Sequence, residues 1–211
     1  MPSPTLEVRV WGDYACWTRP DQKVERMSYL APTPTGIRGV LDAIFFKPEM
    51  IWSIQEIRII SEISMFSLVR NEVKSIAPTR GHVRPLSIED YRTQRNTVGL
   101  RNVKYVVKAE AIVKPGVDAP PIKYIEQARR RVRRGQCAYQ PYLGTREFTA
   151  WFSEPDPDEQ PINVSMKLGR MLHSLEYDPD GSGRASPRFF EAEMVDGVIR
   201  IPTLRDLHHG T

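Results

Sequence analysis

Apolar and polar side chains alternate between Asn102 and Val113, and this pattern limits the folds that the chain can adopt. Apolar residues recur at every second position, and charged residues occupy several of the positions between them. Because successive side chains of a β-strand point to opposite faces, the pattern predicts a strand with one face in a core. The residues predicted to face that core are Val103, Tyr105, Val107, Ala109, Ala111 and Val113. Such a strand needs neighbours, so the chain is predicted to build a sheet around it.

Shorter patterns predict the elements that accompany this strand. Alternating or β-branched segments predict further strands over residues 6–11, 51–63, 66–74, 148–152, 169–177 and 188–201, the last with a hairpin turn at Asp196-Gly197. A first helix is predicted within residues 33–48, because Thr33 is a suitable N-cap and Pro34 fits the first helical position. A second helix is predicted over residues 122–134, with Gly135 suited to its C-terminal cap.

The predicted order of elements indicates the fold class. It runs strand, helix, strand, strand, irregular insertion, strand, helix and strand. This order resembles, with one additional strand, a ferredoxin-like, or RRM-like, βαββαβ domain of the α+β class, with a loop or extended hairpin inserted over residues 75–97. An acidic, proline-rich segment over residues 154–161 predicts a turn or a linker. We therefore expect a ferredoxin-like domain over residues 1–153 and a small antiparallel β domain over residues 154–211.

The second predicted helix carries the strongest functional signal. Its apolar residues Ile125, Ala128 and Val132 recur at helical spacing, and five of the six residues in 129–134 are arginine. Part of this block could be an ordinary solvated face, yet Glu126 alone cannot balance five guanidinium groups. The pattern favours binding of phosphates, with aromatic residues after the helix that can stack on bases. The predicted RNA contacts here are Arg129, Arg130, Arg133, Arg134, Tyr139, Tyr142 and Arg146.

Three other segments hold basic residues that could contact RNA. Residues 12–28 predict either a contact with a nucleic-acid backbone or, equally well, a loop packed over the sheet. Arg38 lies near the start of the first helix, whose glycines allow close approach of a phosphate or, equally, of a strand. His82 lies in the 75–97 insertion, where an RNA contact and a solvated loop are both open. The candidates from residues 12–28 are Tyr14, Trp17, Arg19 and Arg26.

Composition excludes several other classes of protein. The chain has 211 residues with 40% hydrophobic content and a net charge of +4, so it can form a core, and its positive charge matters only where it clusters. Cys16 and Cys137 are too few for a disulfide scaffold or a zinc site and are predicted to be reduced. No residue cluster indicates a metal or cofactor. The chain contains no apolar run of membrane-spanning length and no signal sequence, which predicts a cytoplasmic protein.

Several sequence blocks carry a family resemblance. They cover nearly the whole chain in order, and the most specific are WGDYACWTRP, RRGQCAYQPYLGTREF and MVDGVI. Together they resemble the subtype I-C member of the fifth CRISPR-associated (Cas) protein family. The resemblance implies a RAMP-superfamily, ferredoxin-like RNA-binding protein with a small C-terminal β domain. It also implies cleavage of precursor CRISPR RNA at the repeat hairpin, after which the protein stays on the 5′ handle within the Cascade surveillance complex.

The resemblance also implies positions for catalytic groups. Metal-free RNA cleavage needs a base for the 2′-hydroxyl, a cation for the phosphorane and an acid for the 5′-oxygen. The family places a tyrosine of the first helix and a lysine-histidine pair at the start of the second in these roles. Here those positions hold Phe45, Lys123 and Tyr124. Phe45 has no hydroxyl but could stack on a base, Lys123 suits the phosphorane, and Tyr124 could transfer a proton if neighbouring arginines lowered its pKa.

Two functions follow from these residues. The first is a metal-independent endoribonuclease that cleaves 3′ of the repeat hairpin and leaves a 2′,3′-cyclic phosphate. The second, which Phe45 and Tyr124 favour, is a non-catalytic subunit that binds the 5′ handle. The expected partners are CRISPR repeat RNA and other Cascade subunits, with duplex DNA as a further candidate and no membrane. A generic RRM module is disfavoured because the aromatic RNP patterns are lacking.

Overall fold

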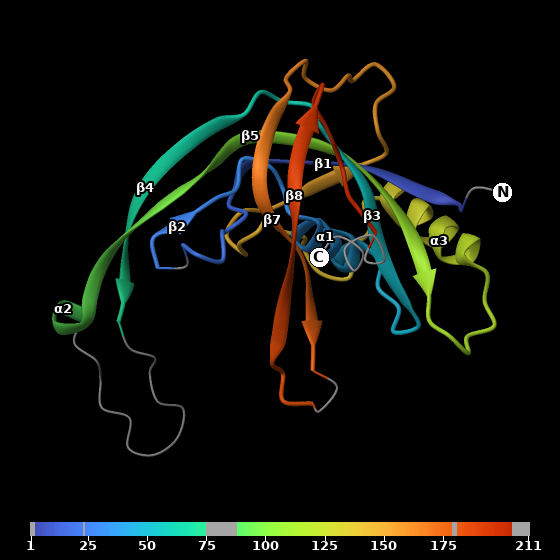
Figure 1. Ribbon diagram of the computed structural model, residues 1–211, viewed down its shortest axis with the longest axis horizontal. Coiled ribbons are helices and arrows are strands. Elements are labelled where there is room, and N and C mark those ends of the chain that lie inside the picture. The colour runs from blue at the N-terminus through green and yellow to red at the C-terminus, as the bar shows by residue number, and fades with distance from the viewer. Residues whose placement is uncertain (1–2, 23, 75–87, 179–180, 204–211) are drawn as a thin grey trace.

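A strongly curved, mostly antiparallel sheet dominates the fold, and few helices accompany it (Figure 1). The computed structural model describes residues 3–22, 24–74, 88–178 and 181–203. In chain order the elements are β1 (Thr5–Ala15), β2 (Arg26–Met27), α1 (Pro34–Ile44), β3 (Met50–Ile59), β4 (Ser64–Val73), α2 (Ile88–Tyr91), β5 (Arg92–Val113), α3 (Pro121–Arg133), β6 (Trp151–Ser153), β7 (Met166–Tyr177), β8 (Ala185–Val195) and β9 (Val198–Arg200).

The strand β5 is the centre of the sheet. The strand order is β6-β1-β5-β3-β9-β8-β7, and β2 and β4 also pair with β5. Val107 of β5 lies opposite Val8 of β1 on one side and Ile57 of β3 on the other, and all three side chains are buried. The alternation read from the sequence therefore reflects a strand with a neighbour on each edge and one face in the core.

The strand β5 begins ten residues before the predicted strand. Residues 92–101 pair with β4, and the two strands form a curved hairpin that projects from the body with α2 at its tip (Figure 1). The loop alternative for residues 75–97 is wrong for residues 92–97, because these polar residues form backbone hydrogen bonds with β4. Of the two alternatives for the insertion, its described residues form the extended hairpin. His82 lies outside the described residues.

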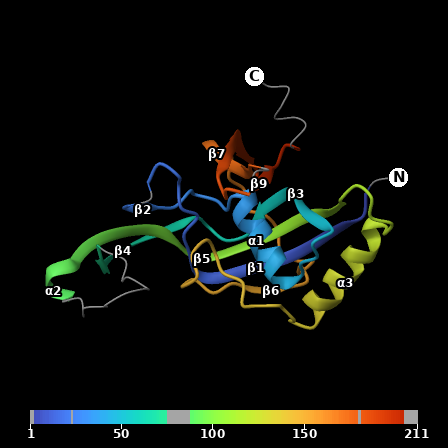
Figure 2. The ribbon, with the colours of Figure 1, turned by 90° about the horizontal axis from the view of Figure 1, so that it is seen from below.

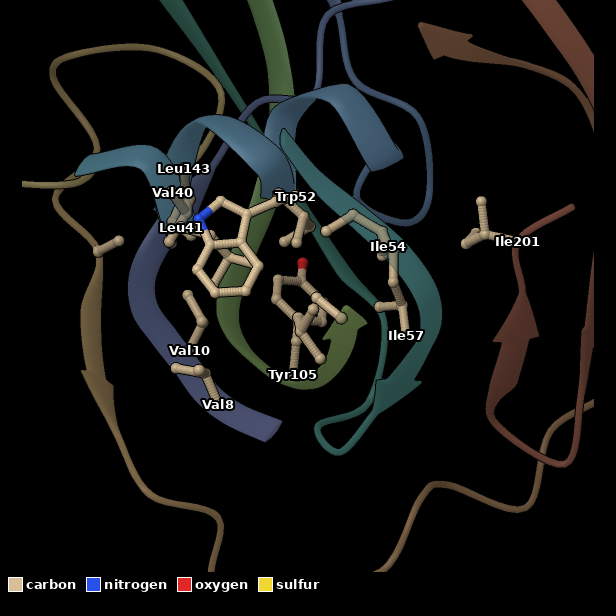
Figure 3. Close-up of a cluster of buried hydrophobic side chains, with 14 of the residues drawn as sticks. Val8, Val10, Val40, Leu41, Trp52, Ile54, Ile57, Tyr105, Leu143 and Ile201 are labelled. Atoms are coloured by element: carbon tan, nitrogen blue, oxygen red, sulfur yellow. The ribbon is translucent and has the colours of Figure 1, made fainter. Parts of the chain in front are cut away.

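The helix α1 closes the core on one face of the sheet. Its predicted start is confirmed: the Thr33 hydroxyl accepts a hydrogen bond from the Gly36 N–H at 3.1 Å. The helix ends at Ile44, earlier than predicted, because Phe45 adopts an extended conformation and its carbonyl accepts the Trp52 indole N–H at 2.9 Å. Figure 3 shows Trp52 and Tyr105 between α1 and the strands.

The helix α3 matches its prediction closely. Tyr124, Ile125, Ala128 and Val132 are buried, and Gly135 follows with the positive φ of +60° that suits a helix C-terminus. The helix lies at the end of the molecule opposite the tip of the β4–β5 hairpin (Figure 2). Its exposed side is therefore separate from that hairpin.

The C-terminal strands continue the sheet across the domain boundary expected near residue 153. The predicted turn at Asp196-Gly197 is confirmed, since both residues have positive φ angles, of 49° and 74°, and join β8 to β9. The strand β9 pairs with β3 from residue 198 to residue 200. Cys16 and Cys137 are free thiols, as predicted. Within the described residues, no helix is long and apolar enough to cross a membrane.

Candidate nucleic-acid interface

One stripe of α3 presents a lysine and two arginines to solvent. Arg130 and Arg134 follow Lys123 by seven and eleven positions, which is close to two and three helical turns, so the three side chains point the same way. All three residues are exposed, and none has an ion-pair or hydrogen-bond partner for its side chain among the described residues. With a rise of about 1.5 Å per residue, the stripe is about 16 Å long.

The other three arginines of α3 have partners within the protein. Arg129 donates to the Thr5 carbonyl at 3.3 Å, and Arg133 pairs with Glu154 at 2.7 Å. Arg131 donates to the Ile44 carbonyl at 2.8 Å and lies 5.5 Å from the Phe45 ring, so it caps the end of α1. Glu126 lies one helical turn before Arg130, but the two side chains form no ion pair in the described part of the chain. The free charge is therefore concentrated on the stripe defined by Lys123, Arg130 and Arg134.

The segment after α3 adds exposed aromatic and basic side chains. Tyr139 is 54% exposed, Arg146 is exposed and Tyr142 is half-buried. The Ala138 N–H donates to the Ala43 carbonyl at 2.8 Å, which holds this segment against the end of α1. The sequence-predicted groups on α3 and in residues 139–146 therefore belong to neighbouring segments.

A second aromatic and basic cluster surrounds Tyr14. Its ring is 48% exposed and lies 4.8 Å from the Phe66 ring and 5.9 Å from the Phe148 ring, measured between centroids. The Arg70 guanidinium lies 5.7 Å from the Phe148 ring and pairs with Glu147. Sequence reasoning missed Arg70, because its partners Glu147 and Phe148 lie 77 and 78 positions later in the sequence.

Three other candidates from residues 12–28 contact other residues of the protein. Trp17 does not lie on the surface predicted for it: it is 2% exposed, packs over Gly36 and cannot stack on a base. Arg19 forms two hydrogen bonds with Asp21, at 3.0 and 3.2 Å. Arg26 forms ion pairs with Glu72 at 3.3 Å and Glu147 at 3.7 Å. The alternative of a loop packed over the sheet describes this segment better, with Tyr14 as the exception.

Arg38 lies apart from the α3 stripe, at a pocket of about 580 Å³ near the start of α1. The pocket is lined by α1, β3, β5, β7 and the segment after β9, and His173 forms part of its wall. The His173 ring contacts the Pro202 carbonyl at 2.9 Å and the Ser174 hydroxyl at 3.1 Å. Burial lowers the pKa of His173, and the Arg38 charge adds to this effect. These effects favour the neutral form of the histidine.

This histidine should make the protein less stable in acid. Because its pKa is lower in the folded chain, the unfolded chain binds a proton first as the pH falls below about 6.5. The contribution of His173 to the free energy of unfolding is thus fully present above that pH and is lost on acidification. We expect the melting temperature to fall less between pH 7.5 and 5.0 in His173→Gln than in the wild type, as measured by thermal unfolding. Equal slopes for the two proteins would contradict this role.

The candidate catalytic positions differ in their access to solvent. Phe45 is 2% exposed and contacts the Trp52 ring, so the stacking predicted for it is not possible, whereas the next ring, Phe46, is 56% exposed. Tyr124 is 2% exposed, and its hydroxyl donates to a Glu49 carboxylate oxygen at 3.3 Å. Burial and the Glu49 charge raise the pKa of Tyr124, opposite to the lowering by arginines considered above. Lys123 is exposed.

These features are typical of one class of protein. A curved antiparallel sheet, an exposed basic helix stripe and uncovered tyrosines are typical of proteins that bind nucleic acids. Among the described residues, no group of three or more His, Cys, Asp or Glu side chains is placed to hold a metal ion.

Comparison with known proteins shows the family. A sequence model described as CRISPR-associated protein (Cas5), of the Cas5d type, matches residues 5–202. A relative from Thermus thermophilus named CRISPR pre-crRNA endoribonuclease Cas5d is 40% identical, over 93% of this chain and 91% of its own length. The chain therefore belongs to the Cas5d family of CRISPR-associated proteins.

Solved structures share the fold. A crystal structure of a CRISPR-associated protein aligns with a TM-score of 0.70 and 23% identity, covering 97% of this chain and 94% of the other. A chain of a CRISPR RNA-guided surveillance complex aligns with a TM-score of 0.56 and 13% identity, covering 98% and 97%. Both are curled, sheet-dominated folds like this one.

Proposed function

We propose that this chain is a precursor CRISPR RNA endoribonuclease that cleaves the repeat hairpin without a metal ion. It then stays bound to the 5′ handle of its product within a Cascade-type complex. The observation that carries the proposal is the exposed α3 stripe headed by Lys123, in a chain 40% identical to a protein named as such an endoribonuclease. The surveillance-complex neighbour supports a place beside other Cascade subunits.

The stripe provides two functions on one helix. Arg130 and Arg134 hold phosphates, and Lys123 at the other end of the stripe stabilises the charge that develops on the scissile phosphorane. Tyr139 and Arg146, next along the chain, stack on or contact nearby bases. Because all of these side chains project from one helix and its following segment, RNA bound by the arginines passes Lys123. The same phosphate contacts would also serve duplex DNA.

The proposal includes a ferredoxin-like core and a two-domain division. The strand order β6-β1-β5-β3, with α1 before β3 and α3 before β6, supports a βαββαβ unit into which the β4–β5 hairpin is inserted. Residues 1–153 would form this unit, and residues 154–211 a small β domain that extends its sheet through β9.

A non-catalytic role is the second candidate function. Buried Phe45 and buried Tyr124 favour it, because neither side chain offers an accessible acid or base to RNA. In that case the α3 stripe would bind the 5′ handle and another protein would cleave the repeat.

Cleavage of the cognate repeat RNA in EDTA separates the two functions. The nuclease should cut the repeat at one position, and a single 2′-deoxy substitution at that position should abolish cutting, because the attacking hydroxyl is gone. A substrate with 2′-deoxy at the next nucleotide is the matched control and should be cut normally. Tight binding of the repeat without cleavage would leave the handle-binding role.

The salt dependence of binding tests the arginine stripe. The double variant Arg130→Ala, Arg134→Ala should bind repeat RNA more weakly at 0.15 M salt. The slope of log affinity against log salt should fall by about one to two units, since each lost phosphate contact removes about 0.7–0.9. A double variant with the same charge change at exposed residues on β7 and β9, Lys167→Ala with Arg200→Ala, is the control. Equal slopes for both double variants would contradict the stripe as the phosphate site.

A further inference from the structure

A carboxylate lies beside the buried tyrosine of α3. The Tyr124 hydroxyl donates to the Glu49 carboxylate at 3.3 Å. The tyrosine side chain is 2% exposed, so it does not reach RNA, but Glu49 is partly exposed. Tyr124 therefore supports a side chain that lies 75 positions earlier in the sequence.

The backbone holds Glu49 firmly between two strands. It precedes β3, and its carbonyl accepts the N–H of Lys114 at the end of β5 at 2.9 Å. The Met50 N–H donates to the Lys47 carbonyl at 3.2 Å, which closes the turn that carries Glu49. A carboxylate fixed by its backbone and by a buried tyrosine is preorganised, which a proton-transfer group requires.

Three lysines lie on the segments that meet at Glu49 and Tyr124. Lys47, Lys114 and Lys123 are exposed, and each belongs to a segment that contacts Glu49 or Tyr124. Consecutive helix residues diverge by about 100°, so Lys123 projects outward from the same turn on which Tyr124 touches Glu49. These lysines offset the repulsion between a carboxylate and an approaching RNA phosphate.

We propose that Glu49 is the general base of RNA cleavage and that Tyr124 is a positioning residue that orients it. The inference deepens the proposed function and rests on it. Tyr124 is poorly suited to be the base itself, since burial and the neighbouring carboxylate raise its pKa and keep its hydroxyl protonated. A protonated hydroxyl donates to the carboxylate and holds one oxygen, which leaves the other free to accept a proton.

The chemical step balances with groups already described. Glu49 takes the proton of the 2′-hydroxyl, and the 2′-oxygen attacks phosphorus and forms the O2′–P bond. The P–O5′ bond breaks, and the 5′-oxygen takes a proton from the Lys123 ammonium, which until then balances the phosphorane charge. The products are a 2′,3′-cyclic phosphate and a 5′-hydroxyl. Exchange with solvent returns the proton from Glu49 and restores the ammonium.

Single-turnover cleavage in EDTA with two substrates tests the assignment. One substrate is the repeat RNA, and the other has sulfur in place of the 5′-bridging oxygen at the scissile phosphate, so its leaving group needs no proton. The variants are Glu49→Gln, Tyr124→Phe and Lys123→Ala, with Glu193→Gln on β8 as the matched control for loss of one carboxylate. Binding is measured on the uncleavable 2′-deoxy repeat.

The expected results separate base, acid and support. Glu49→Gln should slow cleavage about 10²- to 10⁴-fold on both substrates while binding changes less than about threefold. Tyr124→Phe, which keeps the ring, should slow cleavage about tenfold, because the base remains but is less well held. Lys123→Ala should be slow on the oxygen substrate and recover part of its rate on the sulfur substrate. Glu193→Gln should match the wild type.

Three outcomes would overturn the proposal in different ways. Cleavage by Glu49→Gln at the wild-type rate would remove Glu49 from the mechanism. Recovery of Glu49→Gln on the sulfur substrate would make it the acid instead of the base. Loss of RNA binding by Glu49→Gln, with Glu193→Gln intact, would make it a structural residue. If wild-type protein binds the repeat without cutting it, the proposed function fails first.

Discussion

Replacing Lys123 by alanine should slow cleavage of repeat RNA by about 10²- to 10³-fold while the affinity for the repeat changes only a few-fold. Lys123 is the cation at the head of the α3 stripe, and removing one group that stabilises transition-state charge typically has an effect of this size. The two arginines of the stripe remain, so most phosphate contacts persist. Single-turnover rates in EDTA and binding of the 2′-deoxy repeat, measured on the same preparation, separate the two effects.

Two controls make this result specific to position 123. Lys167→Ala removes the same charge from β7 and should cleave at the wild-type rate. Lys123→Arg keeps the charge but changes its geometry and should retain part of the rate. A Lys123→Ala protein that cleaves like the wild type would remove the cation from the mechanism.

Replacing Gly144 by alanine should lower the free energy of unfolding by about 2–5 kcal/mol. A Cβ at this position would lie 1.9 Å from the Cys16 carbonyl oxygen, and its φ of +86° is unfavourable for any L-residue with a side chain. The adjacent Leu143 carbonyl accepts the Cys16 N–H at 3.0 Å, and the Leu143 side chain is buried. The added methyl would push these two segments apart, and the melting temperature should fall by about 5–15 °C.

Gly135→Ala is the matched control for this substitution. Its φ of +60° also lies in the left-handed region, but a Cβ there meets no atom within 4 Å. The control should therefore lose only about 1 kcal/mol from backbone strain. Thermal unfolding of both variants separates strain from steric conflict, and equal losses would show that the contact with Cys16 is not the cause.

The sequence predicted most of the sheet because its strands alternate. The strand containing Val107 was predicted from one face of apolar residues, and the turn at Asp196-Gly197 from its residue types. Residues 92–97 were not predicted as a strand, because they carry polar side chains on both faces and become a strand only by pairing with β4. Local periodicity does not show which distant segments will pair.

The candidate nucleic-acid interface could be predicted from the sequence only where its residues lie on one helix. The common face of Lys123, Arg130 and Arg134 follows from helical spacing alone. By contrast, Trp17 is buried because Gly36, nineteen positions later, leaves room for its ring. Glu49 could not be assigned, because 75 positions separate it from the tyrosine that holds it. Burial and partners of this kind depend on tertiary contacts.

The chemical identity of the cleaved ends tests the central claim most directly. Mass spectrometry of the two products from repeat RNA incubated in EDTA identifies the groups at the cut. Attack by the RNA's own 2′-hydroxyl predicts a 2′,3′-cyclic phosphate on the upstream product and a 5′-hydroxyl on the downstream product. A 3′-hydroxyl with a 5′-phosphate would show attack by water and would contradict the mechanism built on Lys123 and Glu49.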